Sequence, residues 1–85
     1  MDPKPSPEVI RKRVVEIVGR LGKPALIGLV ATELGWWAAL PTTEAILDEL
    51  VESKALRRLT PVEERHWRMK HAYVQAGVED ATKMG

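Results

Sequence analysis

The sequence predicts an α+β fold with a three-helix core and a small antiparallel β-hairpin. Two observations predict this class. Apolar residues recur at helical spacing in three successive segments before residue 54. Beyond residue 54, a short strand pattern is followed by a turn and by a segment in which apolar and basic side chains alternate. With 85 residues, the chain has room for one domain of this kind.

The first helix is predicted over residues 7–21. Ser6 is a favourable N-cap, and Pro7 suits the first helical position because the N–H that proline lacks would be unpaired there. Gly22 suits the position after the helix, and Pro24 prevents its continuation. The apolar stripe of this helix predicts buried side chains at Ile10, Val14, Ile17 and Leu21.

Two further helices complete the predicted core. The second is predicted from Pro24 to Gly35, and the third from Thr42 or Thr43, as its cap, to about Ser53-Lys54. Their spacing predicts buried side chains at Leu26, Leu29, Leu34, Ile46, Leu47 and Leu50.

The hairpin is predicted from residue 56 onward. Its first strand covers residues 56–59, its tip residues 60–64 and its second strand residues 65–70, in which Trp67 and Met69 share one face. A short strand near Pro24-Ala25 would complete the sheet.

Three segments are expected along the chain. Residues 1–5 are rich in proline and polar, and we expect a disordered leader there. Residues 6–71 form the predicted domain, and residues 72–85 a C-terminal tail with a weak helix around residues 73–83.

The composition excludes several kinds of site. The chain contains no cysteine, which rules out disulfides, thiolate zinc sites and a cysteine nucleophile. His66 and His71 have a spacing that suits neither one strand face nor one helix face. The sequence shows no glycine-rich phosphate loop and no serine with a base close in sequence. We therefore predict no enzymatic activity, no metal, no cofactor and no small-molecule substrate.

The same reasoning applies to location. No apolar run approaches the roughly 20 residues that a membrane span needs, and the N-terminal residues lack the apolar region of a signal peptide. We therefore expect a protein of the cytoplasm that does not enter a membrane.

Three segments resemble the winged helix-turn-helix superfamily: residues 29–35 (LVATELG), residues 42–51 (TTEAILDELV) and residues 55–58 (ALRR). The resemblance covers residues 8–70. It implies a small transcriptional regulator that binds double-stranded DNA with its third helix in the major groove and its wing on the backbone or minor groove. The contacts that it implies are Thr42, Thr43, Arg57, Arg58, Arg65, Arg68 and Lys70. Lys54 stands where such proteins commonly have glycine, so either its backbone is strained in the left-handed region or the chain leaves the helix differently.

The net charge of +1 conceals a strongly uneven distribution. Residues 31–53 carry five acidic and no basic side chains, whereas residues 54–71 carry six basic and two acidic ones. The third helix is acidic at Glu44, Asp48, Glu49 and Glu52, and carboxylates repel phosphates. The basic wing is the part suited to phosphate contacts. Its basic side chains can equally be those of a solvent-exposed edge strand, where charge discourages pairing with another strand.

A second function is therefore open. The acidic third helix and the adjacent Trp36 and Trp37, of which we expect one in the core and one partly exposed, could form an interface with a protein partner. The alternation of charge also permits association between copies of this chain, acidic helix against basic wing.

Overall fold

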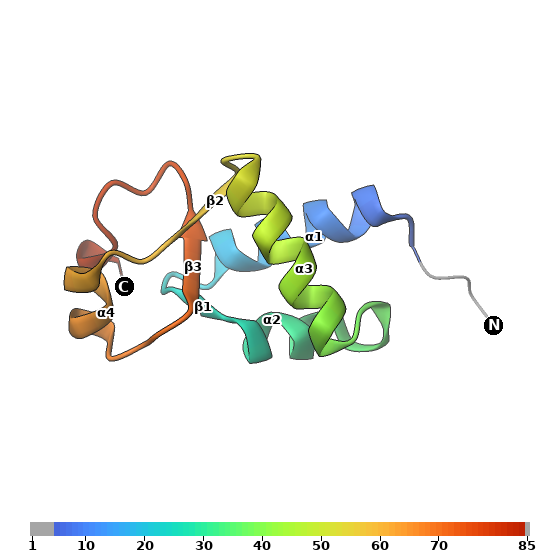
Figure 1. Ribbon diagram of the computed structural model, residues 1–85, viewed down its shortest axis with the longest axis horizontal. Coiled ribbons are helices and arrows are strands. Elements are labelled where there is room, and N and C mark those ends of the chain that lie inside the picture. Colours follow the sequence, from blue (N-terminus) through green and yellow to red (C-terminus); the bar gives the residue numbers. More distant parts are fainter. Residues whose placement is uncertain (1–4, 85) are drawn as a thin grey trace.

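The computed structural model describes residues 5–84. The predicted leader lies outside the described residues, except for Pro5. The elements are α1 (Pro7–Arg20), β1 (Ala25–Leu26), α2 (Ile27–Leu34), the 3-10 turn η1 (Gly35–Trp37), α3 (Leu40–Glu52), β2 (Leu56–Arg58), α4 (Pro61–Trp67), β3 (Ala72–Gln75) and the 3-10 turn η2 (Ala81–Lys83). Figure 1 shows α1, α2 and α3 together on one side of the sheet, and α4 with the C-terminus on the other.

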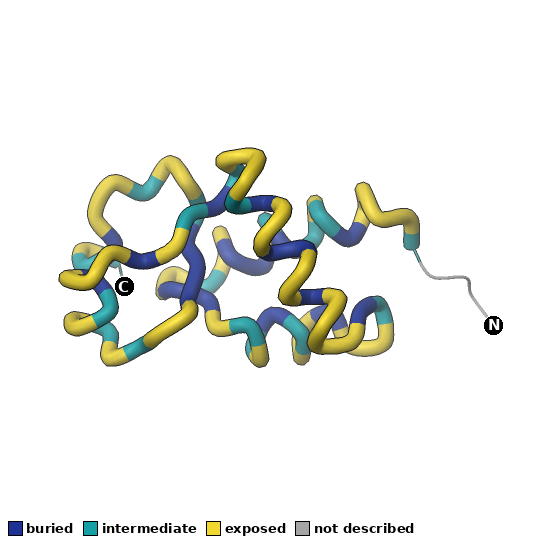
Figure 2. Tube along the Cα trace, viewed as in Figure 1, coloured by how far each residue is buried: buried dark blue, intermediate teal, exposed yellow. Residues whose placement is uncertain are grey.

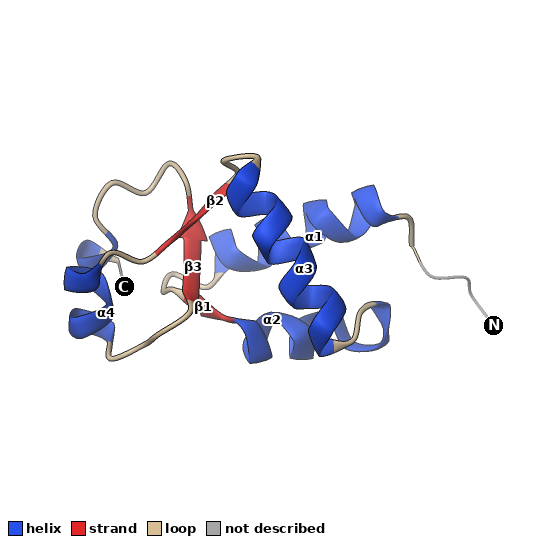
Figure 3. Cartoon of the chain, viewed as in Figure 1, coloured by secondary structure: helices blue, strands red, loops and turns tan. Residues whose placement is uncertain are grey.

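The sheet has three antiparallel strands in the order β1-β3-β2, so β3 is its central strand. Ala25 pairs with Tyr73, and Arg58 pairs with the same Tyr73 from the other side. The predicted short strand near Pro24-Ala25 is present as β1. It delays the start of α2 to Ile27, where we had predicted Pro24 (Figure 3).

The position of the second wing strand was predicted wrongly. Residues 65–70 are not a strand. Residues 65–67 belong to α4, and β3 lies at residues 72–75, in the segment predicted to be a tail with a weak helix. The cause is a capping box. The Thr60 hydroxyl accepts from the Glu63 N–H at 3.3 Å, and the Glu63 carboxylate accepts from the Thr60 N–H at 2.8 Å. With Pro61 in the first turn, this starts a helix where a hairpin turn was expected.

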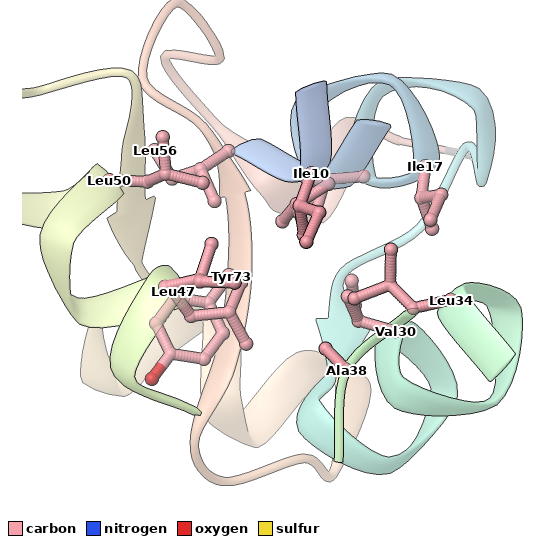
Figure 4. Close-up of a cluster of buried hydrophobic side chains, with 13 residues drawn as sticks. Ile10, Ile17, Val30, Leu34, Ala38, Leu47, Leu50, Leu56 and Tyr73 are labelled. Carbon is pink, nitrogen blue, oxygen red and sulfur yellow. The ribbon is translucent and has the colours of Figure 1, made fainter. Parts of the chain in front are cut away.

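Two hydrophobic clusters lie on the two faces of β3. Tyr73 points into the main core, between the sheet and α1, α2 and α3, whereas Ala72 and Val74 point into a second cluster. Figures 2 and 4 show this core, and its buried side chains are Ile10, Val14, Ile17, Val18, Ala25, Val30, Leu34, Ala38, Ile46, Leu47, Leu50, Leu56 and Tyr73.

Seven of the ten predicted core residues are buried, Leu21 and Leu29 are half-buried, and Leu26 is exposed. Leu26 is 40% exposed, because it lies in β1 rather than in the second helix. The later start of α2 turns Val30 and Leu34 toward the core and leaves Leu29 half-buried. Lys54 has a φ of 66°, so its backbone adopts the left-handed conformation of the first alternative.

The second cluster is held by an ion pair between β2 and α4. Nη1 and Nη2 of Arg57 donate to the two oxygens of the Glu63 carboxylate, at 2.7 and 2.8 Å. Arg57 Nε donates to the Val78 carbonyl at 3.0 Å. Glu63 is only 3% exposed and also accepts from the Ala81 N–H. The hydrogen bond from Arg57 holds the pKa of Glu63 far below its usual range, against the cost of burial. A further hydrogen bond joins α4 to η2, because Trp67 Nε1 donates to the Ala81 carbonyl at 2.8 Å.

Replacing Glu63 by Gln is expected to lower the free energy of unfolding at pH 7 by about 3 kcal/mol, since the Arg57 guanidinium loses its counter-charge. The folded pKa of Glu63 lies below its unfolded value. Its contribution is therefore complete above an unfolded pKa of about 4.3 and is lost as the pH falls toward the folded value. Urea denaturation between neutral pH and about pH 2 should show stability falling more steeply below about pH 4 in the wild type than in Glu63→Gln.

The matched control is Glu79→Gln, because Glu79 is exposed and is in no ion pair within residues 5–84. It should leave the free energy of unfolding nearly unchanged. Parallel pH curves for the wild type and Glu63→Gln would contradict the role given to this ion pair.

Candidate nucleic-acid interface

The two threonines of α3 have different environments. Thr42 is exposed in the first turn. Thr43 is fully buried, and its Oγ1 donates to the Ala39 carbonyl at 3.0 Å. The helix begins at Leu40, with Ala39 as N-cap, so neither threonine is its cap. The implied contact between Thr43 and DNA is therefore not available, whereas Thr42 remains accessible.

The outer face of α3 is acidic, and two of its carboxylates have arginine partners. Asp48 accepts from Arg58 of β2 at 2.8 Å, and Glu49 accepts from Arg11 of α1 at 2.9 Å. Glu44 and Glu52 are exposed and make no ion pair within residues 5–84. Half of the acidic charge on this helix is thus matched by a cation from a neighbouring element.

Arg58 lies at the junction of α3 and the sheet. Its guanidinium carbon lies 6.0 Å from the centre of the Tyr73 ring, and its side chain is 61% exposed. The hydrogen bond to Asp48 raises the pKa of Arg58, while burial raises the pKa of Tyr73. An ion pair this exposed is weak, so Arg58 can exchange Asp48 for another anion.

The Arg57 side chain is 25% exposed. Its guanidinium is occupied by Glu63 and by the carbonyls of Val78 and Arg58. These bonds give Arg57 a structural role, and the wing contact that the resemblance implies for it stays a prediction. Successive side chains of a strand point to opposite faces of the sheet. Arg57 therefore faces Glu63, whereas Arg58 faces Asp48 of α3.

The other basic residues of the wing gather around α4. Arg65, Arg68 and Lys70 are exposed and line an open groove of about 600 Å³, together with Pro61, Glu64 and Met69. Arg68 is the C-cap of α4, with a φ of 56° in the left-handed region. Sequence reasoning placed these cations on a strand; the Thr60-Pro61-Val62-Glu63 capping pattern was the signal that could have placed them on a helix.

The helix N-termini fall into two groups. α1, α4 and η2 each have a side-chain cap, from Ser6, Thr60 and Asp80 respectively. α2 begins after Leu26 and α3 after Ala39, and neither has a side-chain cap. The N–H groups in the first turns of these two helices, which Pro41 of α3 lacks, are therefore not used by a side chain of residues 5–84 and can meet an anion.

We predicted one tryptophan in the core and one partly exposed, and both rings are more exposed than that. Trp37 is half-buried against the main core, while Trp36 is 60% exposed, and the two rings meet edge to face with centroids 6.5 Å apart. Sequence reasoning missed two exposed apolar neighbours in this region, Leu40 at 53% and Val9 at 46%. Val9 and Trp37 line the same shallow depression.

The described residues contain neither a cluster of metal ligands nor a membrane-spanning helix. Residues 5–84 contain no group of three or more histidine, cysteine or acidic side chains that could hold a metal ion. No helix among them is long and apolar enough to span a membrane.

Comparisons with known proteins support the fold. No protein-family model matches the chain, and no curated protein does. A solved structure described as "Crystal structure of holo XcZur" is similar with a TM-score of 0.61 and 21% identity, covering 88% of this chain and 46% of the other. The chain thus spans less than half the length of that protein. The predicted class, an α+β fold of the winged helix-turn-helix type with a three-helix core, is confirmed. The predicted hairpin of the wing is an antiparallel strand pair with α4 between β2 and β3.

The different environments of the two threonines lead to a direct test. Thr43→Val should lower the free energy of unfolding by about 1 kcal/mol, because it removes a buried hydrogen bond without changing the shape of the side chain. Thr42→Val should change it by less than about 0.5 kcal/mol. Urea denaturation of the two variants makes the comparison, and equal losses would contradict the placement of Thr43 in the core.

Proposed function

We propose that this protein binds double-stranded DNA and acts as a small transcriptional regulator. The observation that carries the proposal is the pair of uncapped N-termini at α2 and α3, the two helices of the helix-turn-helix. Phosphate oxygens are the natural acceptors for such N–H groups, and the positive end of each helix dipole favours them. A cytoplasmic location and the absence of enzymatic activity are part of the same proposal.

The base-reading part would be the first turn of α3. Thr42 is exposed there and offers a hydroxyl that can donate or accept. Glu44 follows within the next turn, and a carboxylate can accept from the cytosine amino group. The acidic residues farther along α3 make a close approach of the whole helix unfavourable. The helix would therefore meet the DNA with its N-terminal end.

The phosphate contacts would come from exposed cations of the wing. Arg65, Arg68 and Lys70 lie close together around α4 and have no ion-pair partner within residues 5–84. Arg58 can join them by leaving Asp48. Arg57 is not part of this set, since the loss of its side chain would destabilise the wing itself.

A second candidate function is a winged-helix module for protein contacts. The 60% exposure of Trp36 beside the exposed Leu40 favours it, because large apolar side chains in contact with water commonly mark interfaces. The acidic residues of α3 would then face a basic partner. Binding to DNA distinguishes the two functions.

Fluorescence anisotropy with a random-sequence duplex at several salt concentrations tests the DNA function. About four phosphate contacts predict a log–log slope of affinity against salt of roughly −3 to −4. The triple variant Arg65→Gln/Arg68→Gln/Lys70→Gln should weaken binding and reduce the slope by roughly 3, at about 0.9 per contact.

The control variant Lys12→Gln/Arg20→Gln/Lys23→Gln removes the same charge from exposed residues in or next to α1. It should retain most of the slope. Absence of binding by the wild type at low salt would exclude the DNA function and leave the protein-contact module.

The proposed orientation of α3 can be tested separately. Glu44→Gln should strengthen binding to a random duplex by roughly twofold to fivefold, because it removes a carboxylate close to the phosphates. Glu52→Gln removes the same charge from the far end of the helix and should have a smaller effect. Equal effects in the anisotropy measurement would contradict an approach by the N-terminal end.

A further inference from the structure

Two surfaces at opposite ends of the molecule are not explained by DNA binding alone. The first, which we call the tryptophan end, consists of the apolar side chains of Val9, Trp36, Trp37 and Leu40. Lys12 and the ion pair of Arg13 with Glu16 line the same depression as Val9 and Trp37. The second, the α4 groove, is lined by Pro61, Glu64, Arg65, Arg68, Met69 and Lys70. Figure 1 shows α4 at one end of the long axis and the connection between α2 and α3 at the other, in a molecule 44 Å long.

The tryptophan end is a firm apolar projection. Trp37 packs against the core, and its ring supports that of Trp36 edge to face. Leu40 opens α3, and Glu44 stands one turn farther along the same side of the helix. The projection therefore combines two exposed apolar side chains with a carboxylate that makes no ion pair in the described part of the chain.

The α4 groove has the complementary properties. Pro61 and Met69 give it apolar walls, and Arg65, Arg68 and Lys70 give it three cations against the single carboxylate of Glu64. A further exposed apolar side chain, Val62 at 60%, belongs to the same helix. The α4 groove has a volume of about 600 Å³, which is sufficient for an indole ring and a leucine side chain.

We propose that the tryptophan end of one copy of this chain docks into the α4 groove of a second copy. Trp36 and Leu40 would supply the apolar contacts, and Glu44 would face Arg65 and Arg68. The charge distribution supports a second copy as occupant, because residues 31–53 carry five acidic and no basic side chains while residues 54–71 have a net charge of +4.

The proposed contact is heterologous, since it joins two different surfaces. The surfaces lie at opposite ends of the molecule, so one chain cannot satisfy its own groove and each docked copy presents a free groove or projection to another. Such contacts propagate head to tail. They also use Arg65 and Arg68, so phosphates of DNA would compete with the neighbouring copy for the same cations.

Sedimentation velocity without DNA tests the proposal, from about 10 µM to about 1 mM at low salt. The average mass of the wild type should rise with concentration and fall as salt is added. Two variants should each remain monomeric, with association weakened about tenfold or more. They are Trp36→Ser/Leu40→Ser, which lacks the projection, and Arg65→Glu/Arg68→Glu, which lacks the groove cations.

Mixing the two variants separates this contact from a symmetric one. Each variant retains one intact surface, so an equimolar mixture should form a dimer of one copy of each that does not grow further. A symmetric interface would give no such rescue. Circular dichroism checks that both variants fold, and Arg20→Glu/Lys23→Glu, at exposed residues outside both surfaces, controls for the change of charge.

Three outcomes would overturn the proposal. A wild type that stays monomeric up to the highest concentration would leave the tryptophan end to a different protein. Unchanged association in either variant would place the contact elsewhere, and a mixture without dimers would make it symmetric. The DNA function is judged independently, because the single variant Trp36→Ser, which leaves the first turn of α3 unchanged, should bind the random duplex like the wild type.

Discussion

The wing of this protein depends on one ion pair, between Arg57 and Glu63. The Glu63 carboxylate receives both guanidinium N–H groups of Arg57, the N–H of Thr60 and the N–H of Ala81, so it connects β2, the start of α4 and η2. A buried carboxylate is unfavourable unless it is hydrogen-bonded and paired, and here every partner comes from a different segment. The hydrogen bonds and the ion pair of the Glu63 carboxylate therefore determine the position of α4 and of the cations that it carries.

The sequence predicted the helical half of the molecule better than the wing, for a physical reason. Apolar periodicity reports a face that packs against a core, and α1 and α3 have long, regular faces of this kind. β3 has no such pattern, because it is buried on both faces: Tyr73 packs in the main core and Val74 in the second cluster. Its sequence therefore shows no alternation between apolar and polar residues. A central strand of four residues that packs on both faces is difficult to recognise from its sequence alone.

The candidate site was predictable by residue type but not by environment. Arg57 and Arg58 are adjacent and chemically identical, yet one neutralises a buried acid and the other lies on the surface beside Asp48. Thr42 and Thr43 differ in the same way, because the start of α3 at Leu40 decides which threonine faces the core. Such distinctions depend on strand parity and helix phase, which a shift of one residue reverses. The exposed Val9 and Leu40 were missed because burial of an apolar residue is the usual expectation.

The acidic α3 limits how a helix-turn-helix of this kind can work. Arg11 and Arg58 offset two of its carboxylates, but no cation within residues 5–84 offsets Glu44 or Glu52. The exposed cations Arg65, Arg68 and Lys70 thus lie on the wing and not on the helix that would read bases. If phosphates and the acidic helix of a neighbouring copy both seek these cations, the two forms of binding exclude each other at the same groove. Linkage then requires that DNA disperse the associated copies and that association weaken DNA binding by the same factor.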